Sequence, residues 1–114
     1  MDEISARSGS RIARLDVADP SALLAQLPGW TFHADAGGRI TREFTFADFN
    51  HAFGFMTQVA LAAEKRDHHP EWSNTYRRVT VTWTTHDAGG LTQKDLDMAQ
   101  LCDAVAARLA GGPA

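Results

Sequence analysis

Apolar and polar residues alternate along three stretches of the chain, as they do in strands that bury one face. The first stretch covers residues 30–34, and the second, which Arg42 interrupts, covers residues 40–46. The glycine-containing residues 36–38 separate them, so the pair predicts a hairpin. The third stretch, residues 79–84, alternates valine and tryptophan with threonine. Its β-branched residues make it the clearest strand in the sequence.

A second hairpin is predicted from that third stretch and the residues before it. Trp72 to Tyr76 predict a short strand, and Arg77-Arg78 predict the turn between the two strands. The same two arginines are the one obvious candidate for a basic patch, although such a pair is more typical of a solvated turn. Two hairpins supply enough strands for a four-stranded antiparallel sheet.

Two helix signals lie in the first two thirds of the chain. Residues 21–27 follow Asp19-Pro20, where the carboxylate can cap free N–H groups and proline fits the first helical position. Thr45 and Asp48 resemble a capping box that opens a second helix, which Pro70 ends. The apolar stripe predicted for this second helix consists of Phe49, Phe53, Met56, Ala60 and Ala63.

A third helix follows Gly89-Gly90, where Thr92 and Asp95 again form a capping-box pair. Its predicted apolar stripe consists of Leu96, Ala99, Cys102, Ala106 and Leu109. Because Cys102 belongs to this stripe, it is expected to be a buried small hydrophobic residue rather than a reactive thiol.

The element order α-β-β-α-β-β-α indicates an α+β domain, in which a four-stranded antiparallel sheet carries three helices packed on one face. We expect residues 16–114 to form this single domain and residues 1–15 to be a flexible N-terminal extension. The other face of the sheet is lined with threonines and ends at His86. It is left open to solvent, a ligand or a partner.

Composition narrows the class of protein. The chain has 114 residues, of which 44% are apolar and 22% charged, as in an ordinary globular domain. A net charge of −3 argues against nucleic acid as a direct ligand. No apolar run approaches the roughly 18 residues of a membrane span. One cysteine and the lack of a secretory signal pattern predict a reducing compartment, the cytoplasm.

Three histidines are the main candidates for chemistry: His68 and His69, which directly precede Pro70, and His86 at the end of the clearest strand. Histidine gains and loses a proton near neutral pH, so it serves both as acid and as base. A structural alternative is that the adjacent histidines complement the dipole at a helix end. Acidic residues on both sides of the triplet favour a functional role.

The carboxylates around these histidines have structural alternatives too. Glu64 lies four residues before His68, so the two share a face if the helix continues; otherwise it is an exposed helix-end glutamate. Asp67 has the same two interpretations. For Asp95 the capping box favours structure. Trp72 and Tyr76 supply aromatic rings that suit a flat heterocycle, although core packing is the commoner use of tryptophan.

These residues together closely resemble the pterin-4a-carbinolamine dehydratase family, whose members are also known as dimerisation cofactors of a homeodomain transcription factor. The resemblance extends from about Leu23 to Leu109 and includes the segments of residues 67–72 and 84–91. The residues that match the family pattern at its spacing are Glu64, His68, His69, Pro70, Tyr76, His86 and Asp95.

The resemblance implies a reaction and a set of roles. The family removes water from 4a-hydroxytetrahydrobiopterin, giving quinonoid dihydropterin and recycling the pterin of aromatic amino-acid hydroxylases, with no metal or organic cofactor. By family position, His68 and His86 are the acid/base pair, His69 orients or binds the substrate, and Glu64 fixes the tautomer of a histidine. The other residues expected at the pterin are Asp67, Thr84 and Thr85, with Trp72 as a wall of the pocket and Asp95 near His86.

Two other functions remain open. Relatives of the family act as transcriptional coactivators, and divergent ones resemble assembly chaperones for a carboxylating enzyme, so a protein-binding scaffold is the main alternative. A metal site of three histidines is less favoured, because adjacent histidines rarely reach one ion. The family forms dimers and tetramers, and a short sheet leaves edges to be paired, so a homodimer or homotetramer is expected.

Overall fold

The computed structural model describes residues 13–110, so most of the predicted extension of residues 1–15 lies outside the described residues. Its elements are α2 (Ser21–Gln26), β1 (Thr31–His33), β2 (Arg39–Thr45), α3 (Phe49–Arg66), β3 (Glu71–Thr75), β4 (Arg78–Trp83) and α4 (Gln93–Leu109), with the short 3-10 turns η1 (Asp35–Gly37) and η2 (His86–Ala88). The predicted order of helices and strands is confirmed. Within the described residues no helix is long and apolar enough to cross a membrane.

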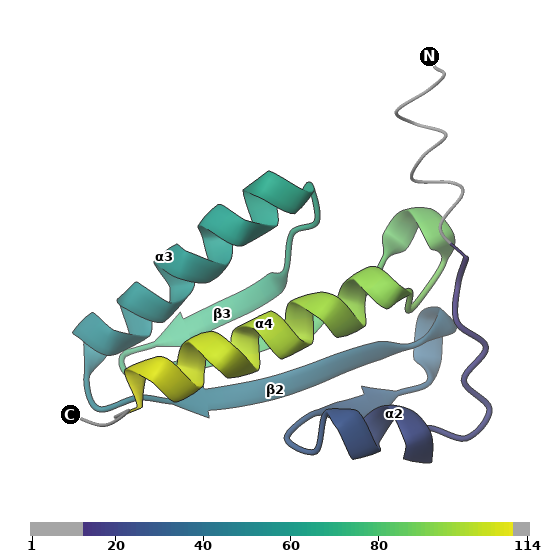
Figure 1. Cartoon of the computed structure of the whole chain (residues 1–114), viewed down its shortest axis with the longest axis horizontal. Helices are drawn as coiled ribbons and strands as arrows, with labels where there is room; N and C mark the ends of the chain where they lie inside the picture. Colours follow the sequence, from purple (N-terminus) through teal and green to yellow (C-terminus); the bar gives the residue numbers. More distant parts are fainter. Residues whose placement is uncertain (1–12, 111–114) are drawn as a thin grey trace.

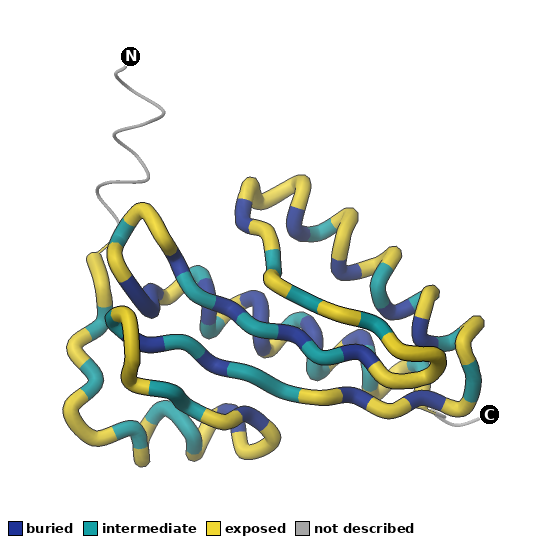
Figure 2. Tube along the Cα trace, turned by 180° about the vertical axis from the view of Figure 1, so that it is seen from behind, coloured by how far each residue is buried: buried dark blue, intermediate teal, exposed yellow. Residues whose placement is uncertain are grey.

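The four strands form one antiparallel sheet in the order β1-β2-β4-β3. Helices α3 and α4 lie side by side over one face, and α2 lies near the short strand β1 at the sheet edge (Figure 1). Seen from behind, the strands are in the foreground and no helix covers them (Figure 2). The predicted α+β class with a four-stranded antiparallel sheet is therefore confirmed.

The two faces of the sheet differ in the way the alternating pattern predicts. Val79, Val81 and Trp83 of β4 are fully buried beneath the helices, and Ile40 of β2 pairs with Trp83 on the same face. The intervening Thr80, Thr82 and Thr84 are half-buried on the open face. This division decides on which side of the sheet each later residue lies.

Arg42 interrupts the alternation of β2 because it ties the sheet to α4. Its Nη1 donates to Oδ1 of Asp103 at 2.7 Å, and the indole N–H of Trp30 donates to the same oxygen at 2.9 Å. The guanidinium also lies 4.5 Å from the centroid of the Phe44 ring. The long arginine stem thus covers apolar surface while its charge is paired at the rim of the core.

The predicted start and apolar stripe of α3 were wrong in part. Thr45 is the last residue of β2, and Asp48 is the helix N-cap, whose carboxylate accepts from the backbone N–H of His51 at 2.8 Å. Phe49 and Phe53, predicted in the core stripe, are 46% and 56% exposed, and Ala60 is exposed as well. The buried residues are Ala52, Phe55, Val59 and Ala63. Two neighbouring stripes of this helix are apolar, so the spacing alone did not identify the one that faces the sheet.

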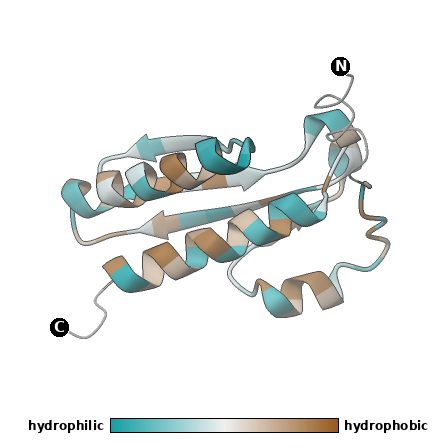
Figure 3. Cartoon of the chain, turned by 45° about the horizontal axis from the view of Figure 1, so that its top comes forward, coloured by the Kyte–Doolittle hydropathy of each residue, from teal (hydrophilic) through white to brown (hydrophobic). Residues whose placement is uncertain are grey.

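The capping box of α4 is confirmed, and its buried face is rotated slightly from the predicted stripe. Ala99 and Cys102 are buried as expected, together with Met98 and Val105, whereas Leu96 is only partly buried. Apolar and polar segments alternate along the length of α4 (Figure 3). The most unusual member of the buried face is Asp95, which has no exposed surface.

Several element boundaries lie one residue away from the prediction, and two of these differences change a cap or a turn. Pro20 is the N-cap of α2 rather than its first helical residue, and Asp19 accepts from the backbone N–H of Ser21 at 3.0 Å. In the second hairpin Thr75 pairs with Arg78, so the turn consists of Tyr76 and Arg77 instead of the two arginines. Tyr76 has a positive φ of 53°, and the side-chain amide of Asn74 donates to the carbonyls of Tyr76 and Arg78.

Candidate active site

The segment His68-His69-Pro70 connects α3 to β3 without helix or strand structure of its own. Helix α3 ends at Arg66, and its C-cap Asp67 is left-handed, with φ 53° and ψ 44°. The helix therefore does not continue to His68, and Glu64 and His68 do not share a helical face. The carboxylate of Glu64 instead accepts from Nε2 of His69 at 2.7 Å, and both side chains are more than half exposed.

His68 turns toward the helix-covered face of the sheet. Its ring stacks on Trp83, with 5.4 Å between the ring centroids and 27° between the planes. Nε2 of His68 lies 2.6 Å from Oδ1 of Asp95, and the histidine is only 9% exposed. Because an ionised carboxylate can only accept hydrogen bonds, this contact fixes the proton of the neutral imidazole on Nε2.

Asp95 is the centre of a buried polar network. Its Oδ2 accepts from the backbone N–H of Thr92 at 2.9 Å and from Oγ1 of Thr85 at 2.8 Å. The hydroxyls of Thr85 and Thr92 are also 2.8 Å apart. The capping-box aspartate thus joins the start of α4 to His68. It was expected near His86, and its direct contact in that region is with Thr85, the residue before His86.

His86 begins η2 and forms a third imidazole–carboxylate pair. Its Nε2 lies 2.7 Å from Oε2 of Glu71, and the two side chains are 79% and 56% exposed. Glu71 is the first residue of β3, directly after Pro70, and it pairs with Thr82 in the sheet register. Sequence reasoning assigned Glu71 no role, because only the register brings its side chain to η2.

A cavity of about 140 Å³ lies beside His86. Its other polar walls are Glu71 of β3, Thr84 just after β4, Asp35 of η1 and Arg39, the first residue of β2. The Arg39 guanidinium Nε lies 3.4 Å from the carboxylate of Asp35. Sequence analysis missed both residues, because the hairpin turn carried no motif.

The backbone of Gly37 in η1 touches the residues that follow η2, next to this cavity. The N–H of Leu91 donates to the carbonyl of Gly37 at 3.3 Å, and Thr84 Oγ1 donates to the carbonyl of Gly38 at 2.9 Å. A Cβ atom built on Gly90 would lie 2.1 Å from the Gly37 carbonyl oxygen, a distance that side chains do not tolerate. Glycine at positions 37 and 90 is therefore required by the close approach.

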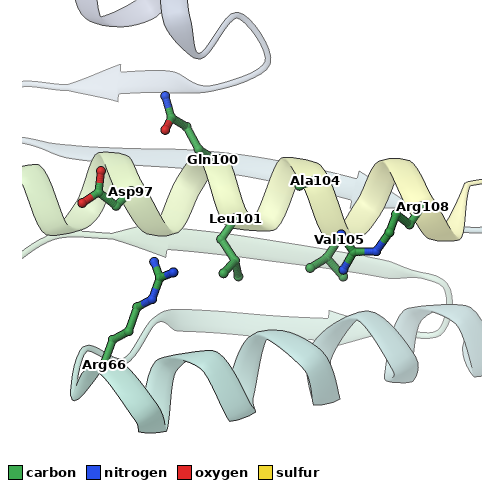
Figure 4. Close-up of a pocket in the computed structure, with 7 residues that line it drawn as sticks. All are labelled: Arg66, Asp97, Gln100, Leu101, Ala104, Val105 and Arg108. Atoms are coloured by element: carbon green, nitrogen blue, oxygen red, sulfur yellow. The ribbon is translucent and has the colours of Figure 1, made fainter.

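His68 is reached from the helix side instead. It lines a cavity of about 160 Å³ with Arg66, Lys94, Asp97 and Met98. Arg66 and Asp97 also line a larger groove, of about 400 Å³, that runs between α3 and α4. Its floor is formed by small and apolar residues of α4, with an arginine near each end (Figure 4).

The remaining predicted residues are spread more widely. Thr85 is buried, Asp67 is exposed at the helix end, and Tyr76 is 64% exposed in the distant hairpin turn. Trp72 pairs with Val81 and packs against the core, and it does not line the cavity beside His86. Within residues 13–110, no three histidine, cysteine, aspartate or glutamate side chains are arranged to hold one metal ion.

Comparison with known proteins identifies the family. The family model described as "Pterin 4 alpha carbinolamine dehydratase" matches residues 13–105. A protein of Novosphingobium aromaticivorans, named provisionally as a pterin-4-alpha-carbinolamine dehydratase, is 60% identical over 89 residues, covering 78% of this chain and 92% of the relative. One from Rhodopseudomonas palustris with the same provisional name is 54% identical over 98 residues, covering 86% of this chain and 96% of the relative.

Solved structures agree with this match. The crystal structure of a transcriptional coactivator/pterin dehydratase from Brucella melitensis has a TM-score of 0.76 and 48% identity, covering 82% of this chain and 98% of that one. A pterin dehydratase-like protein described as a RuBisCO assembly factor in the alpha-carboxysome has a TM-score of 0.59 at 19% identity, covering 68% of this chain and 89% of that one. The second likeness concerns the fold alone. The matched family model spans most of the chain, and the chain belongs to the pterin-4-alpha-carbinolamine dehydratase family.

Proposed function

We propose that the protein removes water from 4a-hydroxytetrahydrobiopterin, giving quinonoid dihydropterin, and so recycles the pterin of aromatic amino-acid hydroxylases. In this reaction the C4a–O bond breaks, the leaving hydroxyl takes a proton, and the adjacent ring N–H loses one. One acid and one base acting on neighbouring atoms of a flat heterocycle are sufficient for this chemistry. Family membership and the provisional names of the relatives support the proposal.

The observation that carries the proposal is that each of the three histidines donates Nε2–H to a carboxylate, at 2.6 Å for His68 and 2.7 Å for His69 and His86. A carboxylate in this position orients an imidazole and fixes its tautomer. The other ring nitrogen, Nδ1, is then the atom through which the histidine takes or gives a proton. Such pairs suit a reaction that needs both an acid and a base.

From the family pattern we assign the proton transfers to His68 and His86, although the two histidines line separate cavities in this structure, with His69 and its partner Glu64 binding or orienting the pterin. By family position we also assign Asp67, Trp72 and Thr84 to the pterin, and of these three Thr84 lines the cavity beside His86. Thr85 and Asp95 are 8% and 0% exposed, which favours a role behind His68 rather than direct contact with substrate. No metal or organic cofactor takes part in the proposed reaction.

A dehydratase assay on the carbinolamine tests this proposal. Replacing His68 or His86 by alanine should lower kcat by about a hundredfold or more, which is the usual contribution of a general acid or base. His33→Ala is the matched control, because His33 is a half-buried histidine of β1 outside the proposed site. Absence of turnover by the intact protein would overturn the proposal.

A protein-binding role is the second candidate, because the Brucella melitensis neighbour is described as a transcriptional coactivator as well as a pterin dehydratase. It predicts that the His68→Ala and His86→Ala variants keep their biological function. The enzyme proposal predicts that function is lost together with turnover. Complementation of a strain lacking the gene, using the same variants, separates the two.

We further propose that the protein acts in the cytoplasm as a homodimer or homotetramer. The sheet ends in β1 and β3, whose outer edges have no partner strand among residues 13–110, and α3 exposes Phe49, Phe53 and Leu61. Exposed edges and apolar side chains of this kind are commonly covered by a second copy. Sedimentation at several concentrations should give a mass of two or four chains, and a monomer at all concentrations would contradict assembly.

A further inference from the structure

We propose that Glu71 is a positioning residue that acts through His86. Its carboxylate holds the imidazole in one rotamer with the proton on Nε2, and leaves Nδ1 of His86 directed to the ligand. The inference rests on the proposed function, because it assigns a role within the same site. Glu71 belongs to the matching segment of residues 67–72, but none of the roles proposed above is assigned to it.

The contact itself is the first support. Nε2 of His86 and Oε2 of Glu71 are 2.7 Å apart, a charge-assisted hydrogen-bond distance that matches the buried pair of His68 and Asp95 at 2.6 Å. Glu71 is the one side chain with a hydrogen bond to His86 among the bonds of the described residues. Without Glu71, the position of the imidazole is therefore set by its own rotamer preferences.

The backbone on which Glu71 lies is the second support. Residues 71–75 form β3, which pairs with β4 along its whole length, and Glu71 follows Pro70 directly. A strand that is fixed by its register holds a side chain more accurately than a loop does. Glu71 therefore links the segment of His68 and His69 to the turn that carries His86.

Exposure is the third support, because it makes a stabilising role a poor explanation. The side chains of His86 and Glu71 are 79% and 56% exposed, and ion pairs in water contribute little to the stability of a fold. Both side chains also line the cavity of about 140 Å³ beside η2. A ligand in that cavity would displace water from the pair, and the lower dielectric would strengthen the bond only while substrate is bound.

A kinetic double-mutant cycle tests the inference. Glu71→Ala should lower kcat by about ten- to a hundredfold with little change in KM, as loss of an orienting partner does. In a His86→Ala background the same substitution should have almost no further effect, because its partner is gone. Glu43→Ala is the matched control. Glu43 is an exposed carboxylate of β2 that pairs with Thr80 on the same open face.

A measurement that needs no activity accompanies the cycle. Three-bond couplings about the Cα–Cβ bond of His86 should indicate one rotamer in the intact protein and averaged rotamers in Glu71→Ala. Averaged couplings in both proteins would overturn the inference, as would additive kinetic effects in the cycle. If the intact protein has no turnover, the proposed reaction is wrong, while a single rotamer that depends on Glu71 still supports the contact.

Discussion

The pairs His68–Asp95 and His86–Glu71 have almost the same length and very different surroundings. The two nitrogen–oxygen distances are 2.6 Å and 2.7 Å. Asp95 is fully buried and accepts three hydrogen bonds, from His68, Thr85 and the backbone of Thr92. The Glu71 side chain is 56% exposed and, in the described part of the chain, forms a hydrogen bond with His86 alone. A contact distance therefore does not indicate what a pair contributes to the fold.

The difference follows from where each partner would go if the pair were broken. Exposed groups return to water at little cost, so a surface pair contributes little to stability. A buried group left without its partner cannot be solvated, which costs several kcal/mol. We therefore expect substitutions at Asp95 to appear mainly in stability, and those at Glu71 or His86 mainly in activity.

The largest expected effect is that of Asp95→Ala. Its removal leaves His68, Thr85 and the N–H of Thr92 without their acceptor, and we expect a loss of at least about 3 kcal/mol in the free energy of unfolding. Urea unfolding of the variant measures this loss. Asp97→Ala is the control, since Asp97 is an exposed aspartate of the same helix. A loss below about 1 kcal/mol would break the contrast between buried and exposed pairs.

The pH dependence of the free energy of unfolding provides a second test, which concerns the buried face of α4. Burial raises the pKa of the Cys102 thiol to about 12, from an ordinary value of 9.0. The thiol of Cys102 therefore loses its proton at a higher pH in the folded protein than in the unfolded chain. The stabilisation that comes from the buried neutral thiol is fully present below pH 9.0 and is lost as the pH rises toward 12.

At pH 10, which is one unit above the pKa of the unfolded thiol, the free energy of unfolding should be lower by about 1.4 kcal/mol for this reason. Unfolding measured at pH 8 and pH 10 should show the loss in the intact protein and a smaller one in Cys102→Ala, which corrects for other titrating groups. Equal losses in both proteins would indicate that solvent reaches this face of α4.

A smaller effect is expected from Thr85→Val, which keeps the shape of the side chain and removes one donor to Asp95. The carboxylate retains His68 and the backbone N–H of Thr92, so we expect a loss of about 1 kcal/mol in thermal or urea unfolding. Thr80→Val is the control, because Thr80 is a half-buried threonine of β4 on the open face. An effect as large as that of Asp95→Ala would show that the hydroxyl, not the carboxylate, organises the network.

The smallest effect on stability is expected from Glu64→Gln. The side chains of Glu64 and His69 are 80% and 55% exposed, so the free energy of unfolding should change by less than about 0.5 kcal/mol. Calorimetry of the variant beside the intact protein measures the difference. A change above about 1 kcal/mol would mean that the short nitrogen–oxygen distance of the pair matters more for stability than the exposure of its side chains.

The strands could be predicted from the sequence more fully than the faces of the helices. Side chains of a strand alternate between two faces, and in β4 one face is apolar and the other carries threonines, so the pattern identifies the buried face. Val79, Val81 and Trp83 are buried as predicted. In α3 the stripe through Phe53 and the neighbouring stripe through Phe55 are both apolar. Only packing against the sheet separates them, so the exposure of Phe53 could not be inferred from spacing.

Sequence reasoning identified the three histidines but not all of their partners. The left-handed conformation of Asp67 ends α3 before His68, and Glu64 pairs with His69 instead. An aspartate does not signal this conformation in a sequence as a glycine would. Glu71, Asp35 and Arg39 come together with His86 only through sheet register and the contact of two turns. Such long-range placements carry no local pattern.

The contact between Gly37 of η1 and Gly90, which follows η2, constrains how this protein could change over evolution. Gly37 and Gly90 approach backbone to backbone, so neither position can acquire a side chain without separating the turns. New substrate preferences therefore cannot arise by mutation of these two glycines. Asp35 and Arg39 line the cavity beside His86 with side chains that are 66% and 36% exposed, so they can be replaced without moving the backbone. Natural diversification and laboratory selection should both act on these two side chains and leave the two glycines in place.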